Sequence, residues 1–144
     1  MEKKQPQIVA EEIHLLFVDT TQFRLKAEEF RNTEKRLLEV AHKLAYNLKD
    51  EKLKIELALS FKDEAGNELL FLTTDYHFRV EKLEQFYDLK EDGTPIFKAM
   101  ILATVLGIAL STSRGILLEK MNTANLPNIL IPVVSPVKLL KQKP

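Results

Sequence analysis

The stretch that decides the fold is residues 38–61, LEVAHKLAYNLKDEKLKIELALSF, in which side chains of two kinds alternate. Every second residue of 38–48 and again of 53–61 is aliphatic, aromatic or histidine, and the residues between them are charged, polar or small. A period of two is typical of a β-strand with one buried face. The charged run 49–52 separates the two stretches, so we predict an antiparallel hairpin.

Two further strands extend this hairpin. Gly66, within the turn-forming run 64–67, can adopt a positive φ, and the alternation resumes over residues 69–80. Upstream, the apolar positions of residues 13–25 change phase around residues 19–21, which predicts a bulge or bend there. We therefore predict four strands in sequence order, joined by short turns, as an antiparallel meander.

A helical region follows the strands. Thr94 is placed as an N-cap with Pro95 at the first helical position, and residues 99–110, AMILATVLGIAL, carry no charge on any side. We expect this long helix to end near residues 123–125. Residues 126–134 contain two prolines, which predicts an extended crossing, and Ser135 and Pro136 begin a last short helix. The predicted fold class is therefore α+β.

The uniformly apolar surface of residues 99–110 predicts a contact beyond the sheet. A helix that covers a sheet needs only one apolar stripe, and a chain of this size cannot enclose the helix from every side. Another copy of the same helix is the simplest cover, so we expect a homo-oligomer. The alternative is a helix buried by the C-terminal segment of its own chain. The expected oligomer interface comprises Met100, Ala103, Leu106, Gly107 and Leu110.

Composition restricts the class of protein. With 144 residues, 45% hydrophobic and 29% charged, we expect a single globular domain over residues 1–144, with residues 1–12 flexible. The 21 basic residues only balance the 21 acidic ones, so nothing favours nucleic acid. The N-terminus has no apolar core typical of a secretory signal, and residues 99–110 are fewer than the roughly 20 that span a bilayer. We expect a cytoplasmic protein without membrane insertion.

Residue types and spacings offer little chemistry. The absence of cysteine excludes disulfides and thiol catalysis, and His14, His42 and His77 fall on three different predicted strands, without the spacing of a metal site. We therefore expect no enzyme, no metal and no cofactor. Aromatic groups at sheet edges beside a helix can instead form a groove for extended peptide. The candidate groove residues are Phe23, Phe61, Phe71, Tyr76 and Phe78.

The order and spacing of these elements resemble the SecB export chaperones. The resemblance covers about residues 12–140 and is clearest in three places. The first is the strand 13–25, and the second is ELALSF at 56–61 with GNE at 66–68. The third is the helix through 107–115, followed by LPN at 126–128 and LIPV at 130–133. It implies a dimer of dimers with helices between sheets, although dimer and tetramer both stay open for this chain. It also implies an ATP-independent chaperone that holds unfolded polypeptides or preproteins in apolar grooves.

Two features depart from the family pattern. In the family, acidic residues on the outer sheet face and an acidic C-terminal tail help dock the SecA motor ATPase. The corresponding positions here are interpreted as Thr20, Arg24 and Thr74, and the tail at 141–144 is KQKP. Since this weakens or reverses electrostatic docking, we leave SecA open as a partner. Two other functions remain alternatives: a module dedicated to one partner such as an antitoxin, and a small-molecule binder that uses the same groove.

Overall fold

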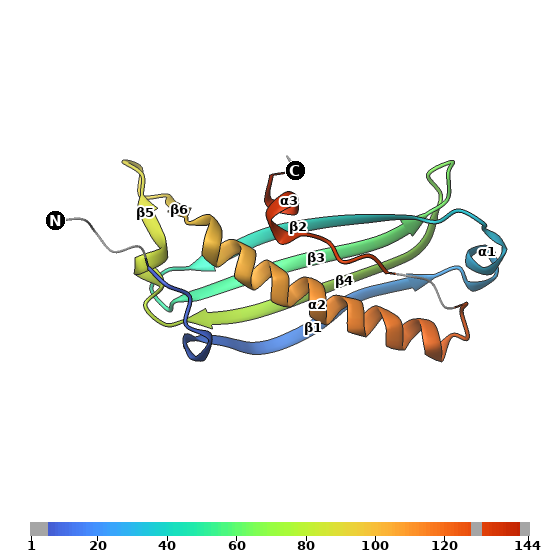
Figure 1. Ribbon diagram of the computed structural model, residues 1–144, viewed down its shortest axis with the longest axis horizontal. Helices are drawn as coiled ribbons and strands as arrows, with labels where there is room; N and C mark the ends of the chain where they lie inside the picture. Colours follow the sequence, from blue (N-terminus) through green and yellow to red (C-terminus); the bar gives the residue numbers. More distant parts are fainter. Residues whose placement is uncertain (1–5, 128–130, 142–144) are drawn as a thin grey trace.

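The computed structural model describes residues 6–127 and 131–141. A four-stranded antiparallel sheet carries one long helix across one of its faces, which confirms the predicted α+β class (Figure 1). The elements, in chain order, are η1 (Ala10–Glu12), β1 (Ile13–Leu25), α1 (Ala27–Asn32), β2 (Leu37–Asn47), β3 (Lys52–Lys62), β4 (Glu68–Val80), η2 (Leu83–Phe86), β5 (Tyr87–Leu89), β6 (Pro95–Phe97), α2 (Ala99–Thr123) and α3 (Pro136–Leu140).

The strand order of the sheet is β1-β4-β3-β2, with all neighbours antiparallel. Strands β2, β3 and β4 form the predicted meander, and Gly66 has φ 87° in the turn between the last two. The expected short turn between the first two strands is wrong, because β1 pairs with β4 instead. The chain between β1 and β2 contains α1, whose Phe30 is fully buried, and this link carries the chain from one edge of the sheet to the other (Figure 1).

The first strand is irregular, as its phase change predicts. The register between β1 and β4 shifts between Thr20 and Gln22, which confirms the predicted bulge. A second shift lies between Leu15 and Phe17. After the shifts, Val18 and Phe23 lie opposite the buried Tyr76 and Leu72 of β4, on the face that carries α2, whereas Phe17 lies opposite His77 on the outer face.

The predicted start of the long helix is wrong. Pro95 belongs to β6, which pairs with β5 in a two-stranded hairpin, and α2 begins at Ala99 after Lys98 as its N-cap. Phe97 explains the difference, since its ring packs edge-on against Tyr46 and Tyr87, with centroid separations of 5.6 and 5.7 Å. The predicted end of the helix near residue 123 is confirmed.

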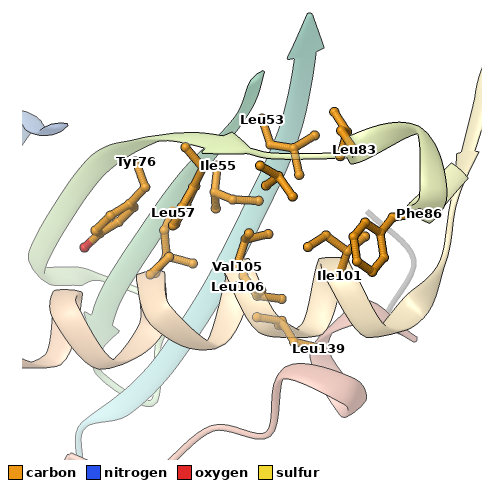
Figure 2. Packing of buried hydrophobic residues seen from close by; sticks show 13 residues of the cluster. Leu53, Ile55, Leu57, Tyr76, Leu83, Phe86, Ile101, Val105, Leu106 and Leu139 are labelled. Atoms are coloured by element: carbon orange, nitrogen blue, oxygen red, sulfur yellow. The ribbon is translucent and has the colours of Figure 1, made fainter. Parts of the chain in front are cut away.

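The core between α2 and the sheet consists of two clusters. The first lies under the N-terminal half of α2, where Ile101 and Val105 belong to one cluster with residues of β3 and β4 such as Ile55 and Tyr76 (Figure 2). The second lies under the C-terminal half of α2 and under α1. Its buried members are Phe30, Leu59, Phe61, Leu69, Leu70, Leu72, Leu117, Met121 and Leu126.

The C-terminal segment covers one flank of α2. Leu139 of α3 is buried in the first cluster, and a Cβ on Gly107 would lie 3.4 Å from Cγ of Pro136. The alternative in which the chain buries its own helix therefore holds for this flank, and Leu106 is fully buried inside its own chain.

By length and composition α2 could cross a membrane, but here it packs on the sheet as part of the core. Residues 128–130, within the expected crossing, lie outside the described residues.

Candidate functional site

An apolar groove runs along strand β2, at one edge of the sheet, where β2 faces α2 and α3. The cavity has a volume of about 900 Å³ and continues around β2 onto the outer face of the sheet. Because β2 is an edge strand, one row of its backbone N–H and C=O groups has no strand beside it among the described residues. The residues that line the groove on the helix side are Val40, His42, Leu44, Ile55, Leu102, Leu106, Leu139 and Leu140.

The alternation of β2 gives the groove its apolar character. Val40, His42 and Leu44 are half-buried and point toward α2, whereas Ala41, Lys43 and Ala45 between them are exposed on the outer face. His42 is the one titratable side chain among the groove residues on the helix side. The groove is therefore suited to apolar side chains spaced two residues apart, which is the spacing of an extended peptide.

The structure does not bring the five predicted aromatic residues together. Phe61, Tyr76 and Phe78 are core residues, so a peptide cannot reach them in this conformation. Phe23 is 37% exposed but lies on β1 at the opposite edge, with Nζ of Lys120 4.7 Å from its ring centroid. Phe71 alone lines the cavity, on its outer-face side.

Sequence reasoning missed the groove residues for a topological reason. Val40 and Leu44 alternate with polar residues in the same way as Ile55 and Leu57 of the central strand β3, which are buried. Only the strand order shows that β2 is an edge strand whose apolar face is half-covered. The second wall, Leu139 and Leu140, comes from a short helix about 100 residues later in the chain.

The outer face of the sheet differs from the expected arrangement. Thr20 and Thr74 face each other across β1 and β4 on the side that carries α2, and Thr74 is fully buried. They are therefore not outer-face positions, which corrects that part of the comparison with the family. Arg24 does lie on the outer face, where its guanidinium donates to Glu68 from Nε at 3.0 Å and from Nη2 at 2.8 Å. This pairing raises the pKa of Arg24 and lowers the pKa of Glu68.

A row of carboxylates crosses the outer face instead. Asp19 of β1 lies opposite Asp75 of β4, which lies opposite Glu56 of β3. Nζ of Lys54 is 3.4 Å from a Glu56 oxygen and 3.5 Å from an Asp75 oxygen, and these contacts raise the pKa of Lys54. The outer face thus carries acidic side chains at Asp19 and Asp75, which directly neighbour Thr20 and Thr74 in the sequence.

The second edge of the sheet exposes apolar side chains. Strand β1 has 13 residues and no strand pairs with its free edge among the described residues. The ring of Phe17 stacks on His77 with centroids 3.9 Å apart, yet Phe17 remains 55% exposed. Long, exposed and apolar edge strands associate readily with another strand. The exposed large apolar residues of β1 are Leu15, Leu16, Phe17, Val18 and Phe23.

Comparison with known proteins shows the fold. No protein-family profile and no curated protein sequence matches the chain. The SecB-like chaperone Rv1957 of Mycobacterium tuberculosis, in complex with a ChAD peptide from the antitoxin HigA1 (Rv1956), is similar in structure, with a TM-score of 0.59 and 10% identity over 88% of this chain and 92% of that one. A protein of unknown function from Streptococcus agalactiae has a TM-score of 0.31 and 16% identity over 84% and 97%. The chain therefore has a SecB-like fold, as the resemblance in sequence predicted.

Proposed function

We propose that this chain is an ATP-independent chaperone, with no catalytic activity, that holds extended segments of unfolded polypeptides or preproteins in the cytoplasm. The observation that supports the proposal is the apolar groove beside the free edge of β2. A peptide added at that edge would pair its backbone with β2 and place alternate side chains against Val40 and Leu44. Each Å² of apolar surface buried contributes about 25 cal/mol whatever the sequence, so such binding would be promiscuous.

A dedicated partner is the second candidate function. The similar chaperone of Mycobacterium tuberculosis is in complex with a ChAD peptide from one antitoxin. The same groove geometry serves either role, because backbone pairing supplies affinity and the side-chain contacts supply selectivity. A pull-down from cells distinguishes the two: one dominant partner favours the dedicated module, and a spread of unfolded proteins favours the general chaperone. A small molecule retained through purification would favour the third alternative, a ligand binder.

The proposal includes self-association of the chain into a dimer or a dimer of dimers. Of the interface residues expected from sequence, Leu106 belongs to the core of its own chain, and Met100, Ala103, Gly107 and Leu110 are half-buried on α2. The exposed apolar side chains of β1 provide a second surface that another copy could cover. Light scattering at several concentrations tests this part, since a monomer at all of them contradicts it.

The groove is tested with neighbouring residues of β2 that face opposite sides of the sheet. Leu44→Ser removes an apolar contact from the groove, and Ala45→Ser changes the outer face of the same strand. We expect Leu44→Ser to weaken binding of reduced, carboxymethylated lysozyme about tenfold, because a buried leucine side chain contributes about 1.5–3 kcal/mol. Fluorescence anisotropy without nucleotide measures this, with thermal melts to confirm folding. Equal affinity of both variants, or no binding by the unmodified protein, contradicts the proposal.

A further inference from the structure

The middle of α2 differs from the rest of the helix. Residues 111–115, Ser-Thr-Ser-Arg-Gly, follow the apolar first half of α2, and the Ser, Thr and Gly residues among them have low helix propensity. The hydroxyl of Thr112 donates to the carbonyl oxygen of Ile108 at 2.8 Å, a contact that often bends helices and that Thr104 also makes, to Met100. The helix is therefore weakest at its centre, where 12 residues precede the run and 8 follow it.

A buried polar layer lies directly under this part of the helix. Ser113 and Tyr76 are both buried and their hydroxyl groups are hydrogen-bonded to each other. Thr74, the next residue of β4 on the same face, is fully buried, and its Oγ1 has no hydrogen-bond partner among the described residues. Figure 2 shows Tyr76 at the end of the first cluster opposite Phe86. Tyr76 belongs to the first core cluster, whereas Thr74 and Ser113 add buried polar groups beside it.

Gly115 has no local packing reason to be glycine. It is exposed, and a Cβ added there would meet no heavy atom within 4 Å. Gly107 differs, because a Cβ there would lie 3.4 Å from Pro136. Since glycine weakens a helix interior relative to alanine, Gly115 makes bending easier without relieving any clash within the chain.

The two halves of α2 are also fixed to the rest of the chain to different degrees. The first cluster is closed by α3 through Leu139 and by η2 through Leu83 and Phe86. The C-terminal half packs Leu117 and Met121 into the second cluster. Beyond that cluster it is held by two side-chain contacts: Nη2 of Arg31 donates to the carbonyl oxygen of Ala124 at 2.7 Å, and Lys120 lies over Phe23. The C-terminal half is thus the part that can move with less disruption.

We propose that α2 bends at residues 111–115 and that its C-terminal part then lifts off the second core cluster, which opens apolar surface on β3 and β4 to an extended polypeptide. This inference rests on the proposed function and adds the conformational step that admits the client. Apolar surface at Leu59, Phe61 and Leu72 becomes accessible in the open state and is covered in the closed one. Apparent client affinity then scales with the fraction of open protein.

Because the sequence contains no cysteine, single thiols can report the opening. Met121→Cys places a thiol in the second cluster, and Val105→Cys places one in the first. We expect a thiol reagent to label the first variant at least tenfold faster under native conditions, because a buried thiol reacts only when its region opens. Adding Gly115→Ala should slow labelling at position 121 about fivefold. The same change should weaken binding of reduced, carboxymethylated lysozyme by the same factor.

Asn122→Ala is the matched control, since Asn122 is exposed and its replacement also raises helix propensity in the C-terminal half of α2. A rigid part that swings about a hinge keeps residue 122 helical in both states, so this change should leave labelling at position 121 unaltered. Equal slowing by Asn122→Ala and Gly115→Ala overturns the proposal, because it indicates fraying of the helix end. A changed oligomeric state of Gly115→Ala in light scattering also overturns it, because the glycine would then serve contact between copies.

Client binding separates this proposal from the proposed function. Slower labelling with unchanged client affinity overturns the gating role while the chaperone function stands. If the unmodified protein binds no client although position 121 labels faster than position 105, the proposed function fails and the gating role fails with it, but the bend itself is supported.

Discussion

Replacement of Phe30 by alanine tests whether the link between β1 and β2 is part of the core. The Phe30 side chain is 0% exposed and its ring packs edge-on against Phe61, with centroids 5.8 Å apart. The guanidinium of Arg36 lies over the same ring, 4.5 Å from its centroid. Removal of a buried phenylalanine costs about 3–5 kcal/mol, and the lost aromatic pair accounts for about 1 kcal/mol of this. We expect Phe30→Ala to lower the free energy of unfolding by about 4 kcal/mol, a large share of a typical 5–15 kcal/mol.

Urea unfolding followed by circular dichroism measures this change, at equal protein concentrations because association adds to apparent stability. Phe17→Ala is the control, since Phe17 is 55% exposed and its removal should cost less than about 1 kcal/mol. If Phe30→Ala lowers the free energy of unfolding by less than about 1 kcal/mol, α1 is not packed against the second cluster and the description of this link is refuted.

Three further changes test the polar contacts. Tyr76→Phe should lower the free energy of unfolding by about 1–2 kcal/mol, because it leaves the buried Ser113 hydroxyl without its hydrogen-bond partner. Thr74→Val should raise the free energy of unfolding, because it removes a buried hydroxyl that has no hydrogen-bond partner among the described residues. Thermal melts compare both variants with the unmodified protein. The Arg24 guanidinium lowers the pKa of Glu68 in the folded protein below its usual 4.5. The pair therefore stabilises the fold fully above about pH 4.5, and this stabilisation is lost as the pH falls through the lower pKa of the folded state. Glu68→Gln should therefore show a shallower loss of stability below pH 4.5 in pH-dependent urea titrations, and equal acid slopes would contradict the assignment.

The sequence predicts the individual strands and helices of this fold, but it does not predict the features that depend on contacts between segments far apart in the chain. The alternation of residues 38–61 and 69–80 defines β2, β3 and β4, because each hairpin depends on neighbouring residues only. The partner of β1 is not local: β1 lies beside β4, about 50 residues away, because α1 carries the chain across the end of the sheet. Pro95 satisfied the local rule for a helix start, yet strand pairing with β5 and the packing of Phe97 placed the start four residues later.

The candidate site was less predictable for the same reason. Aromatic type alone pointed to Phe61, Tyr76 and Phe78, and these large side chains fill the core where α2 covers the central strands. The groove is instead lined by aliphatic residues of an edge strand and of α3. Neither the edge position of β2 nor the docking of Leu139 is encoded in a local pattern, so sequence periodicity could indicate an apolar surface but not where it stays open.

Light scattering during size-exclusion chromatography tests most directly the central claim, that this chain holds unfolded polypeptides without nucleotide. The protein is run alone and with reduced, carboxymethylated lysozyme in buffer free of ATP. We predict that the free protein elutes as an assembly of at least two chains and that the client shifts it to a larger soluble complex containing both. Separate elution of the two proteins at micromolar excess of this chain would contradict the account.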